Sequence, residues 1–321
     1  MINILHKNET QIMNLNVSNN NKNLYTENSL KALCLRIIKE QVEKIIHLET
    51  VVIGAEENEA LHDLRVGIRR TRVGLLTFKP LINPIIYKYL KKTLKESGDI
   101  TGNVRDLDVF IERVKDFEND LKGENGNQST EFSKYFIKKR NEEKIKLVEY
   151  LNKDDHHNFI HQLIDLVNDK NEWINIDCVS SYEGISILEY ASVVVKKRLQ
   201  QVMNFDSSIN QPFEGQLHKL RIEAKKLRYA IEFFANNLNE RGEQLITKMK
   251  AMQDILGEIN DIEVALKKTE LYINTHGKKT KFVNEFHDRL KLEKENLLPI
   301  LESQWEIFRS GEFERILIQE I

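Results

Sequence analysis

Two segments of this chain, 156 residues apart, have nearly the same amino-acid sequence. Residues 61–78 read LHDLRVGIRRTRVGLLTF, and residues 217–234 read LHKLRIEAKKLRYAIEFF. A second pair follows in the same order, with LKESGDITGNVRDLDVFI at residues 94–111 and MKAMQDILGEINDIEVAL at residues 249–266. Two motifs repeated in the same order indicate one structural unit used twice, most simply as two helical bundles packed about a pseudo-twofold axis.

The composition favours an all-α fold. Only four prolines and thirteen glycines interrupt 321 residues in which Leu, Ile, Lys and Glu are abundant. Apolar periodicity predicts helices in the first half at residues 29–52, 61–78, 85–98, 103–121, 131–151 and 156–168. In the second half it predicts helices at residues 185–203, 217–234, 242–256, 259–272 and 281–303, followed by a short tail helix.

The expected domain organisation follows the repeat. Residues 1–28 contain nine asparagines and little periodicity, so we expect a poorly ordered leader. Residues 29–321 are expected to form one domain, with a first repeat at 29–170, a connector at 171–184 and a second repeat at 185–321. Two cysteines are too few for a disulfide framework, the start has no signal-peptide pattern, and no apolar run approaches about 20 residues. We therefore expect a cytoplasmic protein that does not enter the membrane.

In each basic segment a histidine is followed by cations three, seven and ten residues later. On an α-helix these steps return to one face, so each set forms a basic stripe about 15 Å long, at roughly 1.5 Å per residue. Such a stripe suits an extended polyanion better than a single phosphate. The stripes comprise His62, Arg65, Arg69 and Arg72, and His218, Arg221, Lys225 and Arg228.

The apolar positions of both segments recur one residue before these cations, so the cations should flank the buried face, where a groove between helices would lie. The chain has 48 Lys+Arg and 50 Asp+Glu, a formal net charge of −2. Anion binding must therefore come from charge segregation. The alternative is a solvated helix face with intramolecular ion pairs. Because cations recur at equivalent positions in both copies, we favour anion binding, for which arginine, lysine and histidine are suitable donors.

Acidic residues in the second motif allow two interpretations. Asp106 and Asp108 could hold magnesium in an all-helical phosphohydrolase or kinase. Alternatively, Asp99 and Asp254 cap turns at nearby glycines, while Asp106 and Asp261 orient arginines of the basic helices. We favour the second, because both halves would need a metal site and neither contains a DDxxD run.

No cofactor, metal site or catalytic residue is predicted. His157 and His161 have i, i+4 spacing but no HExxH context or nearby cysteine, so we interpret them as surface histidines. The sequence also lacks a G-x-S-x-G motif, a Walker-type loop and a G-x-G-x-x-G motif.

The paired runs LHDLRVGIRRTR and LHKLRIEAKKLRY, each followed by the D-I-x-G-x-x-x-D element of GDITGNVRD and QDILGEIND, resemble the CHAD domain, the conserved histidine α-helical domain. The resemblance covers about residues 29–321. It implies two four-helix units around a basic central cavity, and binding of inorganic polyphosphate, often at cytoplasmic polyphosphate granules, without catalysis. The ligand contacts that it implies are the eight stripe residues, the adjacent Arg70 and Lys226, and the weaker candidates Lys95, Lys250, Arg140 and Arg198.

Other functions stay open at this point. The E-x-E-x-K strand of a triphosphatase-type domain is absent from the sequence, so hydrolysis of a triphosphate is not predicted. Nucleic-acid binding is expected to be unlikely, because Tyr229 is the one aromatic residue near the stripes that does not follow the core period. A magnesium-dependent phosphohydrolase and a helical scaffold for a protein partner are the remaining alternatives. No protein partner is predicted from the sequence.

Overall fold

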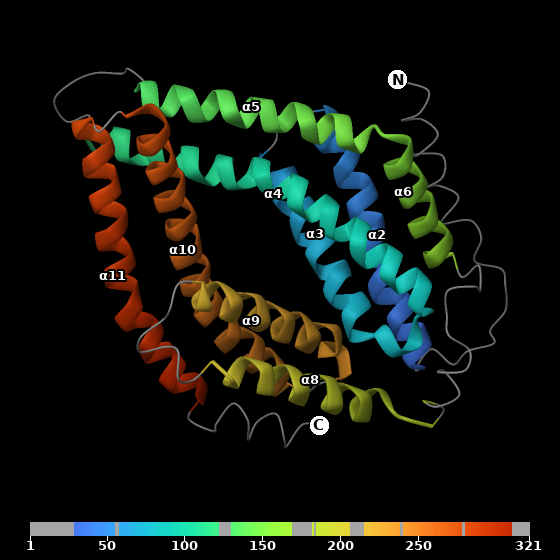
Figure 1. Cartoon of the computed structure of the whole chain (residues 1–321). Coiled ribbons are helices and arrows are strands. Elements are labelled where there is room, and N and C mark those ends of the chain that lie inside the picture. Colours follow the sequence, from blue (N-terminus) through green and yellow to red (C-terminus); the bar gives the residue numbers. More distant parts are fainter. Residues whose placement is uncertain are drawn as a thin grey trace. The chain divides into compact units, whose positions relative to one another are not determined.

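The computed structural model describes residues 29–54, 58–121, 130–168, 182, 184–205, 215–237, 240–277 and 280–309. Their regular elements are α-helices and short 3₁₀ turns, which confirms the predicted all-α class (Figure 1). The expected leader, most of the expected connector and the expected tail helix lie outside the described residues. The helices are α2 (Leu30–Gly54), α3 (Asn58–Thr77), α4 (Pro84–Leu121), α5 (Glu131–Leu151), α6 (Asp154–Val167), α8 (Ile187–Met203), α9 (Gln216–Phe233), α10 (Glu240–His276) and α11 (Lys281–Arg309).

The chain folds into two compact units, and each is assembled from separate stretches of sequence. The first unit contains the chain up to Gly102 together with Lys144–Ile187, and the second contains Asn103–Glu143 together with the chain from Leu188 onward. The helices α4 and α5 therefore each contribute one part to each unit. Two of these spatial boundaries fall inside the expected first repeat, and the third falls just inside the expected second repeat. The compact units and the repeats read from the sequence are therefore different divisions of the chain.

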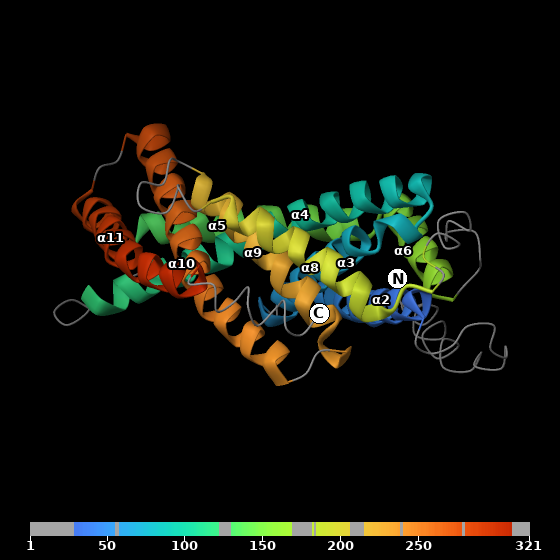
Figure 2. The same cartoon turned by 90° about the horizontal axis from the view of Figure 1, so that it is seen from below.

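In the first unit, α2 packs against α3 and α6 (Figures 1 and 2). The predicted apolar stripe of α3 is buried, with Leu64 at 0% and Ile68 at 2% exposure. Gly67 allows α2 to approach closely, since a Cβ at this position would lie 3.2 Å from Cγ1 of Ile45. A glycine in mid-helix costs roughly 1 kcal/mol relative to alanine. The close packing of α2 on α3 accounts for the presence of Gly67 despite this cost.

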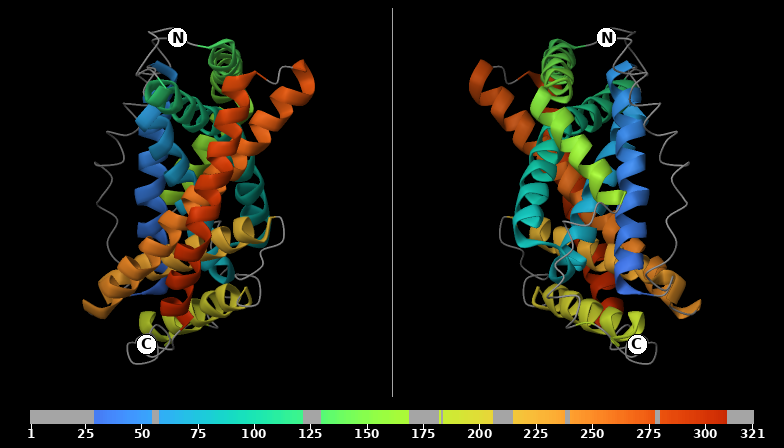
Figure 3. Two further views of the ribbon diagram at one scale, coloured as in Figure 1. Left: turned by 90° about the vertical axis from the view of Figure 1, so that its left-hand side faces the viewer. Right: turned by 90° about the vertical axis from the view of Figure 1, so that its right-hand side faces the viewer.

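In the second unit, α10 packs against α9 and α11 (Figures 1 and 3). An aromatic core joins α4, α5, α10 and α11, with Phe110, Phe132, Phe136, Tyr272 and Phe286 all buried. The rings of Phe110 and Phe286 meet edge to face with centroids 5.9 Å apart, and those of Phe132 and Tyr272 meet in the same way at 4.8 Å. Such pairs stabilise a core beyond their buried area. This core fixes the last part of α4 and the first part of α5.

The sequence-based breaks at residues 98–103 and 256–259 are wrong, because α4 and α10 each continue through them. The cost of a helical glycine is small compared with the burial of the leucine, isoleucine and valine residues on either side of Gly102 and Gly257. Asp99 and Asp254 consequently lie inside helices and do not cap turns. Asp99 instead accepts a hydrogen bond from Nζ of Lys95 at 3.1 Å.

None of the helices in the described ranges is long and apolar enough to cross a membrane.

Candidate anion-binding site

The four stripe residues of α3 lie on one face of that helix, as their spacing predicts. His62 and Arg72 are exposed, whereas Arg65 and Arg69 are half-buried beside the apolar stripe. The cations therefore lie at the edge of the core of the first unit. A guanidinium in this position has lost part of its hydration, so its hydrogen bonds to an anion are stronger than those of a fully exposed group.

Two glycines of α4 make room for two of these arginines. Gly98 and Gly102 are one helical turn apart and share a face of α4. A Cβ on Gly102 would lie 2.5 Å from Nη1 of Arg65, and a Cβ on Gly98 would lie 3.5 Å from Nη1 of Arg72. The guanidinium of Arg65 thus lies where a larger residue on α4 would displace it.

The charges around Arg72 are unbalanced. Although Arg72 as a whole is exposed, its guanidinium lies partly covered beside Gly98, and this partial burial lowers the pKa of the guanidinium. The carboxylate of Asp99 raises that pKa, and the neighbouring cation Arg69 lowers it again. An arginine remains protonated at neutral pH despite such a shift. Asp99 is also bonded to Lys95, so one carboxylate serves more than one cation. An anion placed along this face would relieve the repulsion between Arg69 and Arg72.

On α9, two stripe residues are held by side chains of α10. Nδ1 of His218 lies 2.7 Å from Oδ1 of Asn260. Because an amide oxygen only accepts, the imidazole donates from Nδ1, and this fixes the orientation of the ring. Nη2 of Arg221 lies 4.0 Å from Oδ1 of Asp261. This ion pair agrees with the expectation that Asp261 orients an arginine of the basic helix.

The other cations of α9 lie close to acidic residues of the same helix. Nζ of Lys226 is 2.6 Å from Oε1 of Glu223, and Nε of Arg228 is 3.5 Å from Oε1 of Glu232. Arg228 also lies over the ring of Tyr229, 5.1 Å from its centroid. Lys225 is half-buried. The basic face of α9 is thus partly neutralised by its own helix.

One acidic residue of α3 pairs with another helix. The acidic residue next to its first histidine, Asp63, forms an ion pair of 3.3 Å with Lys44 of α2. Arg70, the adjacent candidate on α3, is half-buried. The helix α3 belongs to the first unit and α9 to the second, and their lining of one shared groove stays a prediction.

The weaker candidates have different surroundings. Lys95 and Lys250 are exposed on α4 and α10. Arg140 forms a 2.8 Å ion pair with Asp108, and both side chains are buried or nearly so. Arg198 is 8% exposed and donates a hydrogen bond of 2.7 Å to Oε1 of Gln201. The burial of Arg140 and Arg198 favours a role in holding the second unit together.

The histidines of α6 differ from the sequence interpretation in one respect. His157 is half-buried and His161 is exposed, whereas their neighbour His156 is buried and its Nε2 lies 3.0 Å from both carboxylate oxygens of Glu49. Within the described ranges, no three His, Cys, Asp or Glu side chains are grouped so that they could hold a metal ion.

Sequence reasoning missed the roles of Gly98, Gly102 and Asn260. The spacing of the two glycines, G-x-x-x-G, is a signal for close approach along one helix face, but the sequence does not say what approaches. Asn260 has no recognisable signal, because its partner His218 lies 42 positions away.

The structure defines an all-helical protein in which two helices of similar sequence each present a basic face. The CHAD domain family model matches residues 36–268, and the chain therefore belongs to the CHAD domain family.

Two solved structures are similar to this chain. The crystal structure of the CHAD domain from the plant Ricinus communis matches with a TM-score of 0.67 and 19% sequence identity, covering 90% of each chain. PptA from Streptomyces chartreusis matches with a TM-score of 0.66 and 13% identity, covering 86% of this chain and 98% of that chain. Identities this low show a shared fold alone. No curated protein matches the sequence.

Proposed function

We propose that this chain binds inorganic polyphosphate, or a related linear polyanion, through the basic faces of α3 and α9 and without catalysis. The observation that supports the proposal is the same order of histidine and cations on both helices, with the arginine at the second position half-buried in each. Membership of the CHAD family supports the same ligand. Repeated cations at helical spacing suit a ligand with repeated charges.

The proposed binding is electrostatic. Arginines offer planar donor pairs to phosphate oxygens, and Lys225 adds a point charge. His62 and His218 can each donate a ring N–H to a phosphate oxygen. Neutralising each phosphate releases counterions, so the logarithm of affinity should fall linearly with the logarithm of salt concentration.

The proposal includes one shared groove with α3 and α9 as its walls. Charge reversal on α3 alone and on α9 alone distinguishes this arrangement from two separate sites. With a shared groove, either variant loses most of the affinity of the whole protein for a short polyphosphate. Two separate sites would instead leave half of the binding stoichiometry at unchanged affinity, measured by calorimetry.

The first experiment is a salt titration of polyphosphate binding. The triple variant Arg69→Glu, Lys225→Glu and Arg228→Glu should bind at least tenfold more weakly. Its salt dependence should also be shallower, with a slope reduced by about 0.7 for each phosphate that no longer pairs with a cation. A matched control reverses three exposed lysines elsewhere, Lys115, Lys134 and Lys153, and changes the net charge by the same amount. Equal weakening in both variants would mean that bulk charge, and not the basic helices, determines binding.

Two further measurements test the alternatives. Single-stranded RNA competing with polyphosphate at equal phosphate concentration would favour nucleic-acid binding. Phosphate release that requires Mg²⁺ and disappears in Asp106→Asn would favour a phosphohydrolase. The proposal expects neither result.

The proposed partner is polyphosphate itself, and the proposed location is the cytoplasm, at polyphosphate granules. A fluorescent fusion of the whole chain should concentrate where polyphosphate collects. It should become diffuse when the cell is depleted of polyphosphate.

A further inference from the structure

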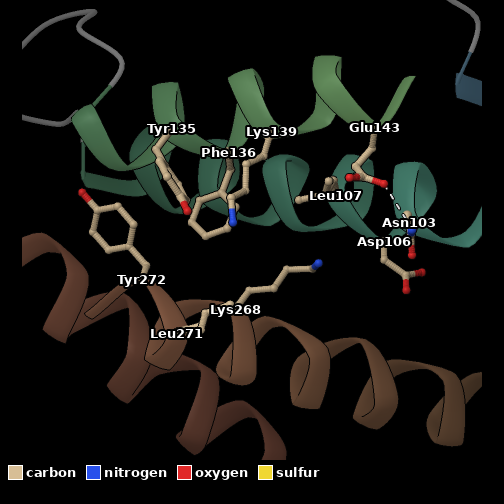
Figure 4. A pocket seen from close by; sticks show the side chains of 10 residues that line it. All are labelled: Asn103, Asp106, Leu107, Tyr135, Phe136, Lys139, Glu143, Lys268, Leu271 and Tyr272. Atoms are coloured by element: carbon tan, nitrogen blue, oxygen red, sulfur yellow. Dashed lines mark hydrogen bonds between the residues drawn. The ribbon is translucent and has the colours of Figure 1, made fainter. Parts of the chain in front are cut away.

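The second unit contains a cavity of about 240 Å³ that involves neither basic helix (Figure 4). Its wall is formed by the second part of α4, the first part of α5 and the later part of α10. Lys139 comes from α5 and Lys268 from α10, and Figure 4 shows both side chains pointing into the space between these helices. Tyr135 and Tyr272 line one end, and Asn103 and Asp106 line the other.

Among the described residues, the two lysines have no direct anionic partner. Both are half-buried, and within the described part of the chain neither ammonium group forms a hydrogen bond or an ion pair. Nζ of Lys139 instead lies over the ring of Tyr135, 5.0 Å from its centroid. An ammonium group that loses hydration on burial is stabilised by an anionic or hydrogen-bonding partner, which replaces the lost water.

The carboxylates in the same wall have other polar contacts. Oε2 of Glu143 accepts a hydrogen bond of 3.1 Å from Nδ2 of Asn103 (Figure 4). Asp106 also makes a polar or charged contact of its own. The acids therefore contribute to the local field without directly pairing with the lysines.

The electrostatics of Lys268 reflect this arrangement. Burial lowers the pKa of its ammonium group, Asp106 raises it, Lys139 lowers it, and Glu143 raises it. Lys139 and Lys268 thus repel each other across a partly desolvated space, and Asp106 and Glu143 offset this repulsion at Lys268. An anion between them would remove that repulsion and supply hydrogen-bond acceptors to both ammonium groups.

We propose that this cavity is a second anion site, which takes one phosphoryl group between Lys139 and Lys268. The two ammonium groups supply hydrogen-bond donors for one phosphate dianion, while Asp106 and Glu143 in the same wall leave the lining without net charge. The closely packed aromatic wall leaves room for a compact group. The phosphoryl group has two possible sources, free orthophosphate and the end of a phosphate chain. The site goes beyond the proposed function, since it uses no residue of α3 or α9.

Amine acylation followed by mass spectrometry of the full chain tests this proposal. Orthophosphate or tripolyphosphate should slow the acylation of Lys139 and Lys268 at least threefold, while the exposed Lys134 and Lys138 of α5 react as before. Protection by orthophosphate alone identifies free phosphate as the source, and protection by tripolyphosphate only identifies a chain end. If neither probe changes the acylation of these two lysines, the proposal is wrong.

Substitutions separate charge from folding. Lys139→Met and Lys268→Met should each weaken orthophosphate or tripolyphosphate binding about tenfold, whereas Lys268→Arg keeps the charge and should retain most of it. The matched control Lys138→Met should bind like the wild type. If both methionine variants retain folding and wild-type binding, the site assignment is wrong.

The triple variant of the basic helices distinguishes this site from the proposed polyphosphate function. It should bind long-chain polyphosphate at least tenfold more weakly but should keep the protection of Lys268 by the small probe. If protection disappears together with long-chain binding, the cavity is not an independent site, whatever the outcome for polyphosphate.

Discussion

The guanidinium of Arg65 on α3 lies directly against Gly102 on α4. A Cβ at residue 102 would be 2.5 Å from Nη1 of Arg65, which is closer than two such atoms can approach. One turn earlier, Gly98 gives looser room to Arg72. The absence of side chains on this face of α4 therefore determines where the cations of α3 lie.

Gly102→Ala should weaken polyphosphate binding severalfold with little loss of stability. The new methyl group displaces the flexible end of Arg65, while alanine favours the helix by about 1 kcal/mol. Gly257, the equivalent residue of the second motif, is the matched control, because nothing lies within 4 Å of a Cβ there. Gly257→Ala should stabilise the protein by up to about 1 kcal/mol and leave affinity unchanged. Salt titrations and thermal unfolding of both variants measure this, and equal affinities would contradict the role of Gly102.

This pair of residues shows what the sequence can and cannot predict. Periodicity is sufficient to predict the buried and basic faces of α3 and α9, because both depend on spacing within one helix. The glycine of the D-I-x-G element is predicted to mark a turn, since glycine alone favours one. Gly102 is helical because the apolar residues on either side of it are buried against other helices. Its role is to make room for the guanidinium of Arg65, which comes from α3. Neither is encoded locally.

The same limit applies to the buried ionic groups. The sequence makes Arg140 a weak ligand candidate because it is a cation, yet its partner Asp108 lies 32 positions away on another helix. The lysines of the cavity, Lys139 and Lys268, come from segments separated by more than a hundred residues. The two lysines line the same cavity only because α5 and α10 pack together in the second unit.

Arg140→Met should destabilise the protein by about 3 kcal/mol, because it leaves the buried carboxylate of Asp108 without its cation. Adding Asp108→Asn to this variant should recover part of the loss, since the uncompensated charge is then removed. Urea unfolding measures both changes. The folded Arg140→Met protein should bind polyphosphate like the wild type. A stable variant with tenfold weaker binding would show instead that Arg140 contacts the ligand.

Cys34 should make stability depend on pH in the alkaline range. Burial raises the pKa of this thiol, so it stays protonated in the folded chain, whereas the unfolded thiol ionises near pH ~8.5. The unfolded state then binds fewer protons, and the free energy of unfolding falls as pH rises above about 8.5, by up to about 1.4 kcal/mol per pH unit.

Comparison with Cys34→Ala isolates this effect, with Cys178→Ser in both proteins to remove the second thiol. The stability advantage of Cys34 over alanine should shrink between about pH 7.5 and about pH 9.5 in urea unfolding. An advantage that is the same at both pH values would show that the thiol does not remain protonated in the folded state.

The buried pair of His156 and Glu49 should stabilise the packing of α6 on α2. Nε2 of His156 lies 3.0 Å from both oxygens of Glu49, and the histidine is 3% exposed. His156→Leu leaves a buried carboxylate without its donor and should cost about 3 kcal/mol. The double variant with Glu49→Leu should recover much of this loss, because apolar pairs often replace buried ionic pairs without penalty. Urea unfolding of the two single variants and the double variant gives the coupling energy. If the losses of the single variants simply add, the contact does not contribute to stability.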